Sequence, residues 1–209
     1  MAYLGEGGKI PYLRKDDIAD EALNVLEECS DGIFPVDVEA ICDNLGIGIL
    51  PIIGLSRNFR VDAFISADFK TIYVDSREFE KDSHRYRFSV AHELGHFILH
   101  KKYCPDGVDD LKEWFRIFRR FINNYAEFQA NYFAGSLLVP EAELVRVLND
   151  GFDGSFVRNY WNASPSELGR ILMKVRRHFR VSDDVIARRM RDAFPGVDEI
   201  DNNKKWRQK

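Results

Sequence analysis

The chain of 209 residues is 45% hydrophobic, which is enough for one domain with a full core and a small appendage. Its net charge of −4 excludes an overall basic protein that would bind nucleic acid through charge alone. Three cysteines without a C-x-x-C pair argue against a disulfide scaffold, and we see neither an apolar leader nor a membrane-length apolar run, so we expect a cytoplasmic protein.

The first part of the chain predicts two helices and a strand. Apolar residues recur at helical spacing over residues 16–29, behind a capping aspartate. We expect a second helix to begin at Pro35 and to stop at Gly46, because proline favours the first helical position and glycine follows the last one. Residues 47–53 predict a short strand, and Pro51 within it indicates a sheet edge or a break.

A β-hairpin is expected next, with strands over residues 61–66 and 71–75 joined by a four-residue turn. An edge strand of this kind can bind an extended peptide as an added strand and hold its scissile bond over a neighbouring metal ion. The alternative is a sheet that only covers the helices. The sequence supports the two alternatives equally.

The central motif is HELGH at residues 92–96, in an apolar segment without proline that predicts a helix over about residues 83–102. His92 and His96 lie one turn apart on the same helical face. Both imidazoles can then reach a single zinc ion, and Glu93 projects toward a water on that ion. The alternative is a buried helix whose histidines only form hydrogen bonds in the core.

A third histidine, His100, follows one turn after His96 on nearly the same face. It lies about 12 Å along the helix axis from His92. One ion can hardly bind both ends of this row, so we expect His100 to support the site or to belong to the core.

A long helix is expected over residues 109–134, with a break near Asn123 and an aromatic stripe that faces the core. A hydrolytic zinc site needs a third protein ligand. We choose Glu127, because a carboxylate among apolar neighbours is costly to bury unless a cation binds it. Asn131, four residues later, can hydrogen-bond a ligating histidine or orient Glu127. The competing ligands are Cys104, Asp106, Asp109 and Asp110.

Together these residues predict the chemistry of a metallopeptidase. A zinc ion polarises a carbonyl and activates water, and the same ligands also accept manganese, iron or cobalt. Glu93 takes the proton of the water as general base and passes it to the leaving amine. The group that stabilises the oxyanion stays open among four candidates: His100, Tyr103, Tyr125 and Tyr132.

The C-terminal part predicts three more helices, over residues 141–150, 164–179 and 181–194. The last two are rich in Lys and Arg and can form a helix-turn-helix or simply a helical cap. We favour the cap and do not expect direct DNA binding. The predicted divisions are a main domain at 1–150, a helical extension at 151–195 and a flexible tail at 196–209.

The run RFSVAHELGHFILH, followed by EFQANYFAGSLLVP, resembles the ImmA/IrrE family of metallopeptidases. The segment FPVDVEAICDNLGIGI and the predicted hairpin extend the resemblance over about residues 16–140. The family's zinc ligands and base fall on His92, His96, Glu127 and Glu93. The resemblance implies an α+β, mostly helical, zincin-like domain with a small antiparallel sheet, here followed by a helical extension.

Members of that family cleave a helix-turn-helix transcriptional repressor. The resemblance therefore implies a zinc-dependent endopeptidase with a repressor as its protein substrate, in a phage, a mobile element or a stress response. The alternative is a non-proteolytic, zinc-stabilised regulatory module or a toxin component of a toxin–antitoxin-like pair. Exchange of Glu93 for glutamine separates these two, because only proteolysis needs the base.

Overall fold

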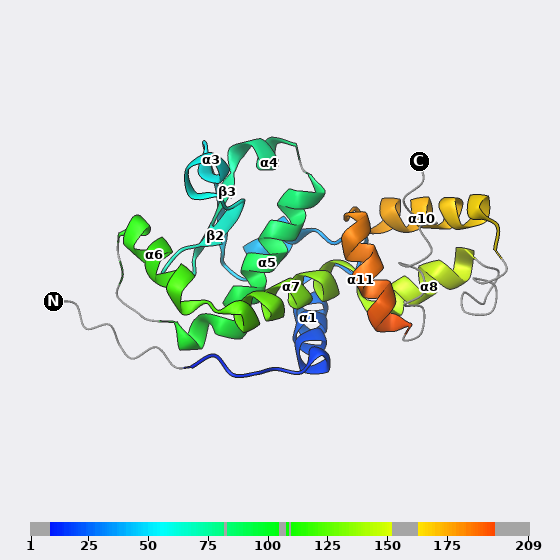
Figure 1. Ribbon diagram of the computed structural model, residues 1–209, viewed down its shortest axis with the longest axis horizontal. Coiled ribbons are helices and arrows are strands. Elements are labelled where there is room, and N and C mark those ends of the chain that lie inside the picture. Colours follow the sequence, from blue (N-terminus) through cyan, green and yellow to red (C-terminus); the bar gives the residue numbers. More distant parts are fainter. Residues whose placement is uncertain (1–8, 82, 105–107, 109, 152–162, 195–209) are drawn as a thin grey trace. The chain divides into compact units, whose positions relative to one another are not determined.

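The computed structural model describes residues 9–81, 83–104, 108, 110–151 and 163–194 (Figure 1). The chain divides into two compact units, residues 1–137 and 138–209. The helical elements of the first unit are α1 (Lys15–Cys29), α2 (Val38–Asn44), α3 (Leu55–Phe59), α4 (Ser76–Glu80), α5 (His84–His100), the 3-10 turn η1 (Lys101–Tyr103), α6 (Leu111–Phe121) and α7 (Asn124–Leu138). Its strands are β1 (Gly48–Ile52), β2 (Ala63–Ile65) and β3 (Thr71–Asp75). The second unit contains α8 (Glu141–Gly151), α10 (Pro165–Phe179) and α11 (Asp183–Ala193).

The first unit combines a three-stranded sheet with helices, so the predicted α+β, mostly helical class is confirmed. The strand order is β1-β3-β2, with β2 antiparallel and β1 parallel to β3. The expected small antiparallel sheet is therefore present as the hairpin of β2 and β3, and the parallel strand β1, which was not expected, makes the sheet mixed. Parallel pairing is possible because the chain passes through α3 and β2 after β1 before it returns as β3. Pro51 lies in β1, an edge strand, as predicted.

A single carboxylate caps the two short helices α3 and α4, which the sequence did not predict. Oδ2 of Asp75 accepts a hydrogen bond from the backbone N–H of Ser56 at 2.9 Å, and Oδ1 accepts one from Arg77 at 3.0 Å. Asp75 is buried at the end of β3. Ser56 is 19 residues away in sequence, so no local pattern could reveal the cap of α3.

The second helix, α2, begins at Val38 rather than at Pro35. Asp37 caps it, because its Oδ1 accepts hydrogen bonds from the backbone N–H groups of Glu39 and Ala40. The predicted stop is confirmed, since Gly46 follows the helix with a φ of +70°.

The predicted helix over the HELGH motif is confirmed as α5, which the Ser83 side chain caps and which ends at His100. One side of α5 packs against β2 and β3 (Figure 1). Another part of its surface meets α7, where Gly95 lies against Ala130. The motif is thus held by the sheet and by α7 at the same time.

The predicted break near Asn123 is also confirmed, because α6 and α7 are separate helices. The Asn123 side chain accepts hydrogen bonds from the backbone N–H groups of Tyr125 and Ala126 at the start of α7. Phe118 of α6 is buried, as the predicted aromatic stripe requires, but Tyr125 and Phe128 are 63% and 46% exposed. The stripe therefore ends where the chain changes direction.

The second unit contains helices at the three predicted places. A capping box between Ser164 and Glu167 starts α10, and Nε2 of His178 lies 2.6 Å from Oε1 of Glu143 on α8. The predicted tail at 196–209 lies outside the described residues. Within the part of the chain that the structure describes, no helix has the length and apolar character needed to cross a membrane.

Candidate metal centre

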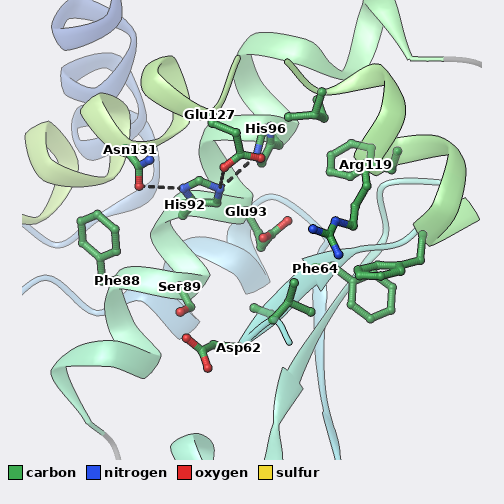
Figure 2. A pocket seen from close by; sticks show the side chains of 15 residues that line it. Asp62, Phe64, Phe88, Ser89, His92, Glu93, His96, Arg119, Glu127 and Asn131 are labelled. Atoms are coloured by element: carbon green, nitrogen blue, oxygen red, sulfur yellow. Dashed lines mark hydrogen bonds and ion pairs between the residues drawn. The ribbon is translucent and has the colours of Figure 1, made fainter. Parts of the chain in front are cut away.

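The structure brings His92, His96 and Glu127 together, with one donor atom from each within 4.8 Å of the others (Figure 2). The two Nε2 atoms of the histidines are 3.0 Å apart. Oε2 of Glu127 lies 3.5 Å from Nε2 of His92, and its Oε1 lies 3.8 Å from Nε2 of His96. Two helices that are distant in sequence thus place three metal-ligating groups around one point.

A glycine in the motif allows α7 to approach α5 closely enough for this. A Cβ built on Gly95 would lie 3.0 Å from Cα of Ala130 and 3.1 Å from its carbonyl oxygen. Ala130 is three residues after Glu127 and one before Asn131. The close contact therefore sets how far these two side chains stand from the histidines.

The buried histidines present unprotonated nitrogens to this point. Burial lowers the pKa of His92 to about 4 and that of His96 well below its ordinary value, so both are neutral near pH 7. Nδ1 of His92 lies 3.2 Å from Oδ1 of Asn131, an acceptor, which places the proton on Nδ1 and leaves a lone pair on Nε2. Two imidazole nitrogens with free lone pairs, together with a carboxylate, form a donor set that can bind a divalent cation.

Glu127 differs from the prediction in one respect. It was expected to point into the core, but its side chain is 51% exposed because it faces a pocket. Burial still raises its pKa, and the nearby charge of Arg119 acts in the opposite direction. The carboxylate is therefore open on one side and faces the histidines on the other.

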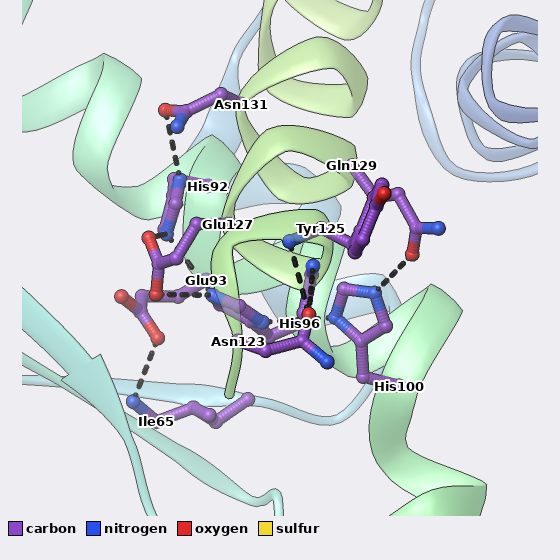
Figure 3. Close-up of polar contacts among 11 residues, drawn as sticks. Ile65, His92, Glu93, His96, His100, Asn123, Tyr125, Glu127, Gln129 and Asn131 are labelled. Atoms are coloured by element: carbon purple, nitrogen blue, oxygen red, sulfur yellow. Dashed lines mark hydrogen bonds and ion pairs between the residues drawn. The ribbon is translucent and has the colours of Figure 1, made fainter. Parts of the chain in front are cut away.

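Glu93 lies beside the three candidate ligands and is 6% exposed. Its Oε2 accepts a hydrogen bond from the backbone N–H of Ile65 on β2 at 2.9 Å (Figure 3). Burial, together with the negative charge of Glu127, raises the pKa of Glu93 to about 8. A carboxyl group that binds a proton near neutral pH is thus held at the pocket wall.

The free edge of β2 is where the predicted pairing with an extended peptide would take place. Asp62 and Ser66 are hydrogen-bonded to β3, so by alternation Ala63 and Ile65 turn their backbone groups to the free edge. At Ile65 the N–H is bound by Glu93 and the carbonyl accepts from Nε1 of Trp114 at 2.7 Å. A peptide that pairs with β2 must therefore do so at Ala63, which lines the pocket.

The pocket beside the metal group has a volume of about 500 Å³. Its walls combine apolar and polar side chains, and the residues that α6 and β2 contribute to them include Phe64, Phe115, Phe118 and Arg119. The guanidinium carbon of Arg119 lies 5.6 Å from the centroid of the Phe115 ring. Figure 2 shows this guanidinium directed into the pocket, toward Glu93. Arg119 is a functional candidate that the sequence analysis did not single out.

Several sequence-based candidates lie elsewhere. Among the described residues that line the pocket, none is one of the four oxyanion candidates His100, Tyr103, Tyr125 and Tyr132. Of the competing ligands, Cys104 and Asp110 do not belong to the metal group found among the described residues, and Asp106 and Asp109 lie outside those residues. Asp110 instead caps α6.

His100 lies behind His96, on the side away from the candidate ligands. Its Nδ1 is 2.9 Å from Nδ1 of His96, and its Nε2 is 2.8 Å from Oε1 of Gln129 (Figure 3). Burial lowers the pKa of His100 as well. These contacts place His100 next to a candidate ligand and inside the core, and its role there stays a prediction.

Comparison with known protein families shows that the chain matches one family model. The model of a peptidase family described as the IrrE N-terminal-like domain matches residues 42–191, which is most of the chain. The match contains the whole metal group and continues through α8 and α10, beyond the predicted resemblance, which stopped at about residue 140. A search of curated proteins finds no match to the chain.

Proposed function

Because the chain belongs to the peptidase family described as the IrrE N-terminal-like domain, we propose that it is a metalloendopeptidase whose zinc ion is bound by His92, His96 and Glu127. The observation that carries the proposal is the convergence of these three donors within 4.8 Å, beside Glu93 and open to a pocket. Zinc suits the donor set, because three protein ligands leave a fourth tetrahedral position free. Manganese or another divalent ion is the alternative.

A zinc ion bound there supplies Lewis acidity toward a peptide carbonyl and a water molecule. The protein's own part begins with Glu93, whose Oε2 is held by the N–H of Ile65 while its Oε1 is available. Oε1 takes a proton from the attacking water and returns it to the nitrogen of the leaving amine, so that peptide and water become a carboxylic acid and an amine. Asn131 keeps the ring of His92 oriented throughout.

Negative charge develops on the carbonyl oxygen as the water attacks, and a fixed cation can stabilise it. We assign this role to Arg119, which lines the pocket and bears a permanent positive charge. The guanidinium lies over the ring of Phe115, and its charge also acts on Glu127 across the pocket. A substrate carbonyl in the pocket would be within the field of that charge.

For the substrate we propose a helix-turn-helix repressor, on the support of the sequence resemblance. The test is incubation of the zinc-loaded protein with a helix-turn-helix repressor from a neighbouring gene, if one is encoded there, with products identified by mass spectrometry. We expect a defined cut that a chelator abolishes and zinc restores. Glu93→Gln should bind zinc but not cleave, because glutamine still accepts from Ile65 but cannot take a proton. Cleavage by this variant would exclude Glu93 as the base.

A non-proteolytic regulatory or toxin module is the second candidate. The hydrogen bond between Glu93 and Ile65 favours it, because this bond gives Glu93 a part in the fold that needs no catalysis. In that case Glu93→Gln keeps the biological activity. His92→Ala and Glu127→Ala would then lose the activity together with the metal.

A further inference from the structure

A chain of hydrogen bonds runs behind the metal group, from the N-terminal segment to His96. Nε2 of Gln129 donates to the carbonyl oxygen of Pro11 at 2.9 Å. Oε1 of Gln129 is 2.8 Å from Nε2 of His100, and Nδ1 of His100 is 2.9 Å from Nδ1 of His96 (Figure 3). The three side chains are almost completely buried, with exposed fractions of 1%, 0% and 1% for Gln129, His100 and His96.

The direction of every hydrogen bond in this chain follows from its first link. A carbonyl only accepts, so the amide nitrogen of Gln129 must face Pro11 and its oxygen must face His100. Nε2 of His100 therefore carries a proton. His100 is buried beside an uncharged partner and is neutral, so its Nδ1 has a lone pair. Nδ1 of His96 then donates to it, and Nε2 of His96 is left without a proton.

We propose that Gln129 is a positioning residue that acts through His100 to fix the tautomer of His96, so that the lone pair of Nε2 is directed at the metal. This inference rests on the proposed metal site. The opposite tautomer of His96 would place an N–H group between His92 and Glu127, where the metal has to bind. Free neutral histidine in water prefers that opposite tautomer, so the fold has to impose the productive one.

The same helix provides a second amide with a matched task. Asn131 is two residues after Gln129 on α7, and its Oδ1 contacts Nδ1 of His92 directly. Gln129 reaches His96 only through His100. Each amide thus orients a different candidate ligand, so a variant at one amide is the experimental control for a variant at the other. Pro11 also lies upstream of the residues that the family model matches, so a segment outside that match takes part.

The test is to read the histidine tautomers of the metal-free protein by long-range proton–nitrogen NMR on a sample with nitrogen-15 in its histidines. In the wild type we expect the proton on Nδ1 of His92 and His96 and on Nε2 of His100. Gln129→Met should mix the tautomers of His96 and His100 and leave His92 unchanged. Asn131→Leu should do the reverse. Zinc affinity, measured by competition with a chromophoric chelator, should fall about 10- to 100-fold in Gln129→Met.

A second variant keeps the test open if Gln129→Met fails to fold. His100→Phe removes the acceptor of His96 and retains most of the ring volume, so His96 should lose its single tautomer. The inference is overturned if His96 keeps its proton on Nδ1 in the folded variants, or if zinc affinity falls without a change of tautomer. Failure of the zinc-loaded protein to cleave any substrate would count against the proposed function only, because the tautomers are read without metal.

Discussion

Gly95 and Ala130 are in backbone contact, and a Cβ on Gly95 would lie 3.0 Å from Cα of Ala130. The contact joins the helix that holds both histidines to the helix that holds Glu127. Because the atoms that a new Cβ would meet are backbone atoms, they cannot rotate away. Any side chain at position 95 must separate the two helices.

We therefore expect Gly95→Ala to weaken zinc binding and to lower the free energy of unfolding by about 1–3 kcal/mol. Chelator competition measures the first effect and chemical denaturation the second. Gly169→Ala is the matched control, because Gly169 lies inside α10 and a Cβ there meets nothing within 4 Å. That change should stabilise the protein by about 0.5–1 kcal/mol. Unchanged zinc affinity in Gly95→Ala would show that the contact does not position Glu127.

The hydrogen bond between Glu93 and Ile65 allows the structural role of Glu93 to be tested apart from the catalytic role proposed for it. Glu93→Leu and Glu93→Gln should both be inactive, but only leucine leaves the buried N–H of Ile65 without an acceptor. We expect Glu93→Leu to be less stable than Glu93→Gln by about 1–3 kcal/mol. Urea denaturation of the two metal-free variants measures the difference. Equal stabilities would mean that the Ile65 N–H finds another acceptor.

Local periodicity predicted the two histidines of the metal group, whereas Glu127 was chosen because a carboxylate among apolar neighbours is costly to bury. His92 and His96 are four residues apart on one helix, and this helix continues four residues beyond the motif to His100, which lies in the same row. Asn131 was predicted to contact a ligating histidine, and the capped break at Asn123 was visible from residue type alone. The row of histidines and the cap at Asn123 depend on neighbours within about one turn of helix, whereas the contact of Asn131 with His92 joins residues 39 apart in sequence.

Features that depend on the packing of distant elements could not be predicted. Whether Arg119 faces solvent or the pocket depends on how α6 lies over α5, and no pattern within α6 encodes this. The parallel pairing of β1 with β3 has the same origin, because a strand sequence does not specify its partner. Gln129 is the clearest case, since its partners Pro11 and His100 come from two other segments.

Arg119 should affect catalysis but not metal binding. We expect Arg119→Met to lower kcat/KM at saturating zinc by about 100-fold, because the developing charge on the carbonyl oxygen loses its cation. Arg116→Met is the control on the same helix, since Arg116 pairs with Glu113 at 3.8 Å and does not line the pocket. Cleavage rates and zinc affinities of both variants decide the matter. Equal rates for the two variants would remove Arg119 from the mechanism.

The buried histidines make the stability of the metal-free protein depend on pH. The pKa of His92 falls from its ordinary 6.5 to about 4 in the fold, so between these values the unfolded chain binds more protons and stability rises with pH. Glu93 has the opposite effect on stability. Its pKa rises from 4.5 to about 8 in the fold, so between these values the folded chain binds more protons and stability falls as pH rises. The two effects oppose each other in the wild type. The Glu93→Gln variant removes the second one.

In metal-free Glu93→Gln we therefore expect the free energy of unfolding to increase between about pH 5 and pH 7, by about 2 kcal/mol from His92 alone. His96 adds to the increase, because its pKa is lowered in the same direction. The wild type should show a smaller increase over the same range. Denaturation curves in chelator at several pH values provide the measurement. Equal stability at both ends would mean either that the histidines take up protons in the folded state or that Glu127, whose pKa is also raised, offsets their effect.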